Sequence, residues 1–178
     1  MDLKIDKPIC FFDLETTGVN VSNDRIVEIS VVKINIDKTE DSKTWLINPT
    51  IPIPAKVSVI HGITDEMVKD KPNFSELASE ISGFIKDCHL AGFNSNKFDV
   101  PMLIEEFLRA DFDFDISTIE LIDVQNIFHK MEKRTLSAAY KFYCGKEHEN
   151  AHSSLSDAKA TYEAVSYTHL TLPTSNGV

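Results

Sequence analysis

The chain has 178 residues, of which 42% are hydrophobic and 26% charged, a composition typical of one globular domain rather than a disordered or fibrous chain. Acidic residues outnumber Lys and Arg by 28 to 18, and the formal net charge of −10 excludes a protein that grips nucleic acid through a broad cationic face. No apolar run approaches the ~20 residues needed to span a bilayer. The amino terminus has no apolar signal core and the three cysteines are widely spaced, so we expect reduced thiols and a cytoplasmic protein.

The first part of the chain has the pattern of strands. Residues 8–14 form a compact apolar run that ends in an acid, and residues 25–36 and 43–47 are rich in β-branched and aromatic side chains. Turn residues separate these runs, so we expect an antiparallel meander of three strands. Residues 48–54 contain three prolines, which cannot continue a strand ladder, and they predict a loop.

Helical periodicity begins at Phe74 and continues to residue 85, and Asn73 and Glu76 before and within it fit a capping box. The elements predicted after this helix are a short strand at 89–93, a helix from about Val100, a short strand at 120–124, and helices over 135–143 and 154–165. Strands followed by strand–helix alternation predict the α/β class, with a mixed sheet flanked by helices.

The end of the chain differs from the rest. Residues 166–178 carry no charged side chain and break the preceding helical pattern. We expect a single domain over residues 1–165 and a non-native or disordered tail over 166–178, in which foreign sequence has cut the last helix short. We therefore expect the functional residues to lie within residues 1–165.

Asp13 and Glu15 are the first candidate functional residues. Two carboxylates at i and i+2 of a strand point to the same face of the sheet. The run before them is apolar on both faces, which is typical of a central strand, and acids there repel each other unless a cation compensates. An ordinary acidic strand end running into a turn explains the same two residues equally well.

Further candidates lie at two predicted helix starts. Asp99 follows a short strand and precedes Pro101, so by itself it has the pattern of an N-cap. His152 and Asp157 have the spacing H-x4-D at the start of the last helix, which lets both side chains face one pocket. Taken singly, they are typical of a solvated loop histidine and of an acid that interacts with the helix dipole. The order of all these groups along the chain is much more specific than any one of them.

This order resembles the DEDD exonucleases, which have Asp-x-Glu near the amino end, Phe-Asp about ninety residues later, and His-x4-Asp near the carboxyl end. The match is to the histidine-containing (DEDDh, DnaQ-like) branch, typified by the proofreading epsilon subunits of bacterial DNA polymerases, because the tyrosine branch would place Tyr where Ser153 stands. The similarity covers residues 8–165 and includes the segment 60–64. Asn94 lies one residue further from Asp99 than in the commonest form of the motif and is left out of the site. The resemblance implies an RNase H-like fold.

The activity that this resemblance implies is metal-dependent 3′→5′ exonuclease activity, which hydrolyses phosphodiester bonds from the 3′ end of single-stranded DNA and releases 5′-mononucleotides in proofreading or repair. In such chemistry two divalent ions about 3.5–4 Å apart activate a water and stabilise the leaving oxygen. Ligands that are all oxygen suit two Mg²⁺ ions, with Mn²⁺ as a substitute. The implied metal ligands are Asp13, Glu15, Asp99 and Asp157.

The roles within this group also follow from the resemblance. Asp13 would bridge both ions, Glu15 and Asp157 would complete the site of the nucleophilic water, and Asp99 would act on the second ion. His152 would be the general base, since an unperturbed pKa of ~6.5 lets it accept a proton near neutral pH. Because surrounding carboxylates raise the pKa of a histidine, we expect activity to climb toward mildly alkaline pH.

Substrate-binding residues are implied in the same way. Thr16, Ile60 and His61 match positions at which relatives hold the terminal nucleotide by backbone contact, base packing and hydrogen bonding. For His61 the alternative is a loop histidine beside a turn glycine. The expected partners are the 3′ end of a single strand, DNA rather than RNA, and a DNA polymerase subunit.

Three alternatives stay open. An RNA-trimming exonuclease of the same branch, similar to oligoribonuclease or RNase T, would use the same catalytic residues. A non-catalytic module of the same fold would lack an acid or the base, whereas all five residues are present. An acidic cation-binding protein would have loops with ligand spacing, and nothing in the sequence resembles an EF-hand.

Overall fold

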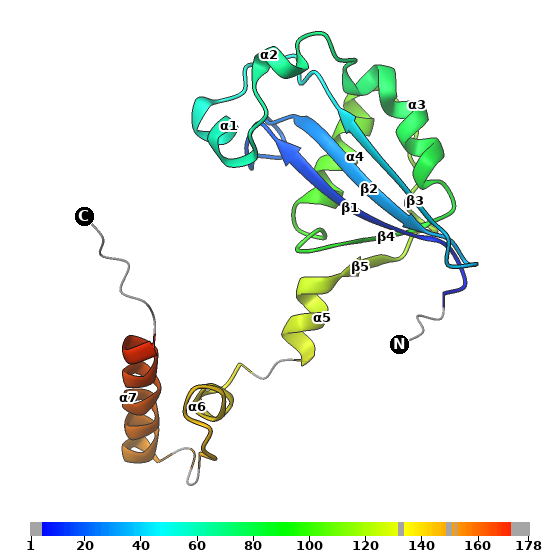
Figure 1. Ribbon diagram of the computed structural model, residues 1–178. Helices are drawn as coiled ribbons and strands as arrows, with labels where there is room; N and C mark the ends of the chain where they lie inside the picture. The colour runs from blue at the N-terminus through cyan, green and yellow to red at the C-terminus, as the bar shows by residue number, and fades with distance from the viewer. Residues whose placement is uncertain (1–4, 132–133, 149–150, 152, 172–178) are drawn as a thin grey trace. The chain divides into compact units, whose positions relative to one another are not determined.

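The computed structural model describes residues 5–131, 134–148, 151 and 153–171 of the chain (Figure 1). It consists of two compact units, Met1–Asn126 and Ile127–Val178. The expectation of one domain over residues 1–165 stays a prediction. Within the described residues no helix has the length and apolar character that a membrane span requires.

The first unit is built on a five-stranded sheet with the strand order β3-β2-β1-β4-β5. An antiparallel meander is formed by β1 (Ile9–Thr16), β2 (Ile26–Ile34) and β3 (Glu40–Leu46). The other two strands, β4 (His89–Gly92) and β5 (Leu121–Asp123), extend the sheet in parallel to β1. The predicted mixed sheet is therefore confirmed, and β1 is its central strand.

The helices that begin in this unit are α1 (Ala55–His61), α2 (Asp65–Val68), α3 (Phe74–Ile85), α4 (Asp99–Arg109) and α5 (Val124–Met131) (Figure 1). The predicted capping box starts α3, because the Asn73 side chain accepts a hydrogen bond from the backbone of Glu76 and the Glu76 carboxylate accepts one from the backbone of Asn73. Residues 49–54 form the predicted loop, and Asn48 before them makes an isolated bridge with Asn73. The short helices α1 and α2, as well as α5, were not predicted.

Side chains of β1 alternate between the main hydrophobic core and the opposite face of the sheet. Phe12 and Leu14 are buried in the core, whereas Asp13 between them is exposed. Helices α3 and α4 complete the core through Phe74 and Phe107, whose rings meet edge to face with centroids 5.1 Å apart. The core thus fixes β1 on one side and leaves its acids on the other.

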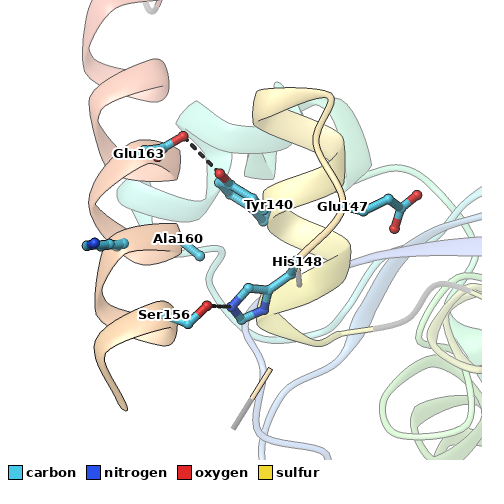
Figure 2. Close-up of a pocket in the computed structure, with 7 residues that line it drawn as sticks. Tyr140, Glu147, His148, Ser156, Ala160 and Glu163 are labelled. Carbon is cyan, nitrogen blue, oxygen red and sulfur yellow. Dashed lines mark hydrogen bonds between the residues drawn. The ribbon is translucent and has the colours of Figure 1, made fainter. Parts of the chain in front are cut away.

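The second unit contains two packed helices, α6 (Leu136–Cys144) and α7 (Ser154–Thr171). Thr135 caps α6 by accepting a hydrogen bond from the backbone of Ala138 at 3.2 Å. The hydroxyl of Tyr140 on α6 donates to the Glu163 carboxylate on α7 at 2.9 Å, beside the buried Ala160 (Figure 2). These contacts join the two helices.

The end of α7 differs from the prediction. The helix does not end at Val165 but continues to Thr171, so the first part of the expected tail is helical. The physical reason is that residues 166–171 contain neither Gly nor Pro, and the first strong helix breaker beyond Val165 is Pro173. Residues 172–178 lie outside the described part of the chain.

Candidate active site

Asp13 and Glu15 lie on the face of β1 that is turned away from the core, as the i, i+2 spacing predicts. On the neighbouring antiparallel strand β2, Ser30 is directly opposite Asp13 and Glu28 is directly opposite Glu15. Directly opposed residues of an antiparallel pair point to the same face of the sheet. A third acid, Glu28, is therefore part of this group.

The pKa of the Glu15 carboxyl is raised above its ordinary value. Burial is the main cause, and the negative charges of Asp13 and Glu28 act in the same direction, while His61 acts in the opposite direction. Glu15 thus has carboxylates on its own strand and on the next one, and a histidine near enough to offset part of their effect. A cation bound at this point would relieve the repulsion.

Asp99 is joined to the same group from α4. Its side chain is only 6% exposed, and its pKa is raised to about 6, first by burial and then by the charge of Asp13, against the effect of backbone hydrogen bonds that include Leu14 of β1. The N-cap interpretation of Asp99 is wrong, because α4 begins at Asp99 itself, with Phe98 in the cap position and no side-chain cap hydrogen bond. Asp99 lies instead against the acidic end of β1.

The loop that leads to Asp99 is held by Asp123 at the end of β5. Asp123 is 5% exposed, and its carboxylate accepts hydrogen bonds from the backbone of Asn94 at 2.9 Å, Asn96 at 3.2 Å and Gln125 at 2.9 Å. Burial raises its pKa, but these backbone donors outweigh burial and leave the pKa of Asp123 below its ordinary value. Its charge in turn raises the pKa of Asp99.

Neither Glu28 nor Asp123 was among the predicted site residues. A signal for Asp123 existed, since it lies near the carboxyl end of the strand predicted over 120–124, and the carboxyl ends of neighbouring parallel strands lie at one edge of a sheet. For Glu28 no comparable signal existed, because its place opposite Glu15 depends on strand register.

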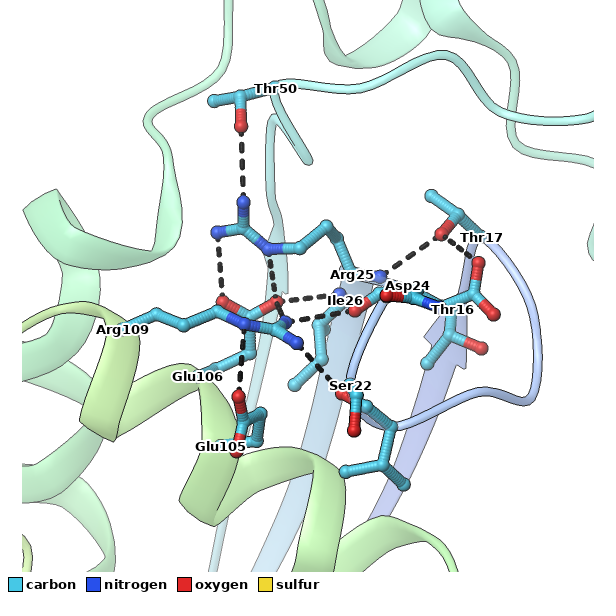
Figure 3. Close-up of polar contacts among 12 residues, drawn as sticks. Thr16, Thr17, Ser22, Asp24, Arg25, Ile26, Thr50, Glu105, Glu106 and Arg109 are labelled. Atoms are coloured by element: carbon cyan, nitrogen blue, oxygen red, sulfur yellow. Dashed lines mark hydrogen bonds and ion pairs between the residues drawn. The ribbon is translucent and has the colours of Figure 1, made fainter.

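An ion-pair network around the buried Glu106 fixes the turn between β1 and β2 to α4 (Figure 3). Glu106 of α4 is 1% exposed and accepts hydrogen bonds from the Arg25 guanidinium at 2.7 and 2.9 Å. Arg109 lies 3.4 Å from the same carboxylate and donates to the backbone oxygen of Asp24 at 2.9 Å. Within the turn, Thr17 donates to the Asp24 carboxylate at 3.0 Å. The helix that carries Asp99 is thereby locked to the turn that follows Glu15.

The three predicted substrate-binding residues differ in their surroundings. Thr16 is buried and donates to the backbone oxygen of Gly18 at 2.6 Å, whereas Ile60 on α1 is 82% exposed. His61 ends α1, before Gly62 with a φ of 79°, and its Nδ1 accepts a hydrogen bond from the backbone of Ile63 at 3.0 Å. Because Nδ1 is an acceptor, Nε2 carries the hydrogen. Among the described residues, this buried Nε2 has no hydrogen-bond partner.

The remaining two predicted residues belong to the second unit. Asp157 lies in the first turn of α7, where its Oδ1 is 3.3 Å from Nε2 of His148. His152 lies outside the described residues. The structure therefore brings Asp13, Glu15 and Asp99 together, and the association of Asp157 and His152 with them stays a prediction.

The carboxylates of the candidate site are of the type that binds hard divalent cations. Within the described residues no three His, Cys, Asp or Glu side chains are already arranged to hold a metal ion. Nevertheless Asp13, Glu15 and Asp99 offer only carboxylate oxygens, the ligands that Mg²⁺ and Mn²⁺ prefer. The pKa values of Glu15 and Asp99 are both raised by burial and by Asp13, a repulsion that a divalent ion would neutralise. These acids fit part of a metal site.

Comparison with known proteins agrees with the motif order. The sequence pattern of the exonuclease family (RNase T) matches residues 10–165. DNA polymerase III subunit epsilon of Treponema pallidum is 39% identical over 120 residues, which cover 67% of this chain and 50% of that protein. The epsilon subunit of Buchnera aphidicola subsp. Schizaphis graminum is 33% identical over 163 residues, which cover 84% of this chain and 69% of that protein. A PolC-type DNA polymerase III of Caldanaerobacter subterraneus is 31% identical over 153 residues, which cover 85% of this chain but 11% of that protein.

Solved structures confirm the RNase H-like fold. Exonuclease I of E. coli, in complex with a dT13 oligonucleotide, matches with a TM-score of 0.64 at 19% identity, over 93% of this chain and 41% of that one. The chain spans between about a tenth and a half of the length of several of these polymerase relatives. With the family pattern matched from β1 to α7, the chain belongs to the exonuclease family.

Proposed function

We propose that the chain is a metal-dependent 3′→5′ exonuclease that removes 5′-mononucleotides from single-stranded DNA. The observation that carries this proposal is the group of Asp13, Glu15 and Asp99, in which burial first and the charge of Asp13 second raise the pKa values of Glu15 and Asp99. Membership of the exonuclease family gives this group its chemistry. DNA is the proposed substrate because relatives are named as subunits of DNA polymerase III.

The proposed metal ligands are Asp13, Glu15, Asp99 and Asp157, with Asp157 contributed by α7. A pair of Mg²⁺ ions, when bound, would supply charge neutralisation at the phosphate and a water of lowered pKa. His152 would accept the proton of the attacking water, the role of a general base. The four carboxylates would hold the metal ions and orient the attacking water, and His152 would take the proton from that water.

Three residues are proposed to hold the 3′-terminal nucleotide. The exposed Ile60 offers an apolar side chain to the base, and the backbone at Thr16 lies directly after the acids of β1. The buried Nε2–H of His61 is a hydrogen-bond donor without a partner among the described residues, and an unpaired buried donor is costly. A phosphate or sugar oxygen of the substrate would accept from this Nε2–H once a shift of the ring or of α1 exposes it.

The chain would act in the cytoplasm, in proofreading or repair, with a DNA polymerase subunit as its protein partner. The net charge of −10 predicts weak binding to DNA in the absence of metal or partner, since bound cations would have to attract the strand.

The test is a time course on a 5′-labelled single strand with Mg²⁺, with Mn²⁺ and with EDTA, alongside an RNA strand of the same sequence. We expect labelled products that shorten one nucleotide at a time with either metal and no shortening with EDTA. Immediate release of a labelled mononucleotide would show the opposite direction. Faster cleavage of the RNA strand would favour the RNA-trimming alternative, and an intact strand with both metals would contradict the proposal.

A further inference from the structure

His148 is a buried histidine of the second unit that the proposed mechanism does not use. Its side chain is 3% exposed and lies between α6 and α7 (Figure 2). Nδ1 is 3.1 Å from the hydroxyl of Ser137 on α6, and Nε2 is 3.3 Å from the hydroxyl of Ser156 on α7. The ring also meets Tyr140 edge to face, with centroids 5.8 Å apart. The imidazole is therefore held in one orientation by both helices.

This orientation directs Nε2 at Asp157. The distance from Nε2 of His148 to Oδ1 of Asp157 is 3.3 Å. An ionised carboxylate is only an acceptor, so a hydrogen bond in this contact has Nε2 as its donor, although the Ser156 hydroxyl lies at the same distance from Nε2. In a neutral ring with its hydrogen on Nε2, Nδ1 accepts from the Ser137 hydroxyl. The Asp157 side chain is 39% exposed on the first turn of α7, so solvent reaches a carboxylate that also contacts the buried imidazole.

We propose that His148 positions Asp157 for the divalent ion; this inference rests on the proposed function, in which Asp157 is a metal ligand. A donor that binds one carboxylate oxygen fixes the plane of the carboxyl group before the metal arrives. The conformational entropy of the Asp157 side chain is then lost when the protein folds rather than when the metal binds. His148 is a positioning residue, because it contacts a ligand and neither the substrate nor the reacting atoms.

A purely structural role is a weaker explanation of the same geometry. The pairing of α6 with α7 has a separate polar contact, in which Glu163 accepts from Tyr140 at 2.9 Å and from Lys146 at 2.7 Å. This contact lies in the same pocket as His148 but does not involve Asp157. Tyr140 therefore provides a matched control, since removal of its hydroxyl disturbs the helix pair without touching the proposed ligand.

The experiment compares His148→Leu, His148→Asn, His148→Gln and Tyr140→Phe in the full chain. Leu lacks the donor, the amide of Asn is too short to reach, and the amide of Gln ends near the place of Nε2. The measurements are Mn²⁺ binding without DNA by calorimetry, the Mg²⁺ concentration for half-maximal hydrolysis of a single strand, and thermal unfolding.

We expect His148→Leu and His148→Asn to weaken Mn²⁺ binding and to lower hydrolysis about 10- to 100-fold, which is typical for the loss of a partner of a metal ligand. His148→Gln should restore both within a few-fold, and Tyr140→Phe should keep the metal dependence of the unchanged chain. If His148→Leu does not fold, the comparison of His148→Asn with His148→Gln tests the inference in its place. Unchanged metal binding in a folded variant without the donor, or an equal loss in Tyr140→Phe, would overturn the inference.

Asp157→Asn, measured in parallel, separates this inference from the proposed function. If Asp157→Asn is inactive while His148→Asn keeps the metal dependence of the unchanged chain, only the positioning role of His148 is lost. If Asp157→Asn hydrolyses DNA with unchanged metal dependence, the proposed metal site is wrong, and the role of His148 is lost with it.

Discussion

Glu15 and Glu28 lie directly opposite each other on the antiparallel strands β1 and β2. Like charges in this position destabilise a strand pair, and Glu28 is one of the causes that raise the pKa of Glu15. An arrangement that weakens the sheet in the absence of a cation is typical of a binding site rather than of a structural surface.

Glu28→Gln should lower the pKa of Glu15, because it removes a negative charge that faces this carboxyl. The measurement is an NMR titration of the Glu15 side-chain carboxyl carbon in the absence of divalent ions. Glu40→Gln, on β3 in a position that does not oppose Glu15, is the control. A titration of Glu15 that is the same in Glu28→Gln and in the unchanged chain would show that the two side chains turn away from each other.

Asp99→Asn should stabilise the metal-free protein at neutral pH while abolishing hydrolysis. The pKa of Asp99 is raised from 3.8 to about 6, so between these pH values the native state binds the proton more tightly than the unfolded state. The free energy of unfolding of the unchanged chain must then fall as the pH rises through this window, and the carboxylate costs at most about 3 kcal/mol above it. Asn lacks this cost.

The measurement is urea unfolding in EDTA at pH 4 and pH 8. The two proteins should be similar at pH 4, and Asp99→Asn should be the more stable at pH 8. A stability difference of the same size at both pH values would contradict the assignment.

Glu106→Gln should destabilise the chain by roughly 3 kcal/mol, since it removes the buried carboxylate that compensates Arg25 and part of the compensation of Arg109. Glu106 is 1% exposed and contacts both Arg25 and Arg109. The neighbouring Glu105 is 36% exposed and lies 3.4 Å from Arg109, so Glu105→Gln should cost less than about 1 kcal/mol. Chemical denaturation of both variants checks this prediction. An equal loss of unfolding free energy in Glu106→Gln and Glu105→Gln would refute it.

Asp13→Asn should abolish metal-dependent hydrolysis and leave the fold intact, because the side chain is exposed and its loss creates no cavity. The measurement is the 5′-labelled strand assay with circular dichroism as the check on folding. Asp113→Asn, an exposed acid outside the candidate site, should keep full activity. Wild-type turnover in Asp13→Asn would remove this residue from the metal site.

His152→Ala should lower the rate about 10²- to 10⁴-fold, as expected for the loss of a general base, with metal binding largely kept. The unchanged chain should become more active as the pH rises to mildly alkaline values, because the base acts in its neutral form. The variant should lose this dependence. A pH–rate profile that is the same in both proteins would exclude histidine from the mechanism.

Local patterns sufficed for much of the fold and for part of the site. The capping box at Asn73 and the common face of Asp13 and Glu15 were predictable because they depend on residues two or three positions apart. The helix pattern of α1 and α2 is too short to be recognised, at seven and four residues. The extension of α7 beyond Val165 differs from the prediction because a segment without charged side chains still continues a helix when it contains neither Gly nor Pro.

Contacts between distant parts of the chain were beyond these patterns. The N-cap interpretation of Asp99 was wrong because α4 begins one residue earlier than this interpretation requires, with Phe98 in the cap position. As the first residue of the helix, Asp99 makes no side-chain cap hydrogen bond and its carboxyl lies near Asp13 instead. The roles of Glu28 and Asp123 depend on strand register and on a loop folding back over a strand end. Neither can be seen in residue spacing.

Helix α4 has Asp99 as its first residue and, two turns further on, Glu106 bound to Arg25. Helix α4 therefore connects the β1–β2 turn, which it binds through Glu106, to the Asp99 carboxyl beside β1. The length of this turn and the position of the Asp99 carboxyl thus depend on each other. Insertions into residues 18–24 would shift that carboxyl without altering any acid. For protein engineering, this turn is therefore a poor place for a tag, because the helix bound to it carries a proposed metal ligand.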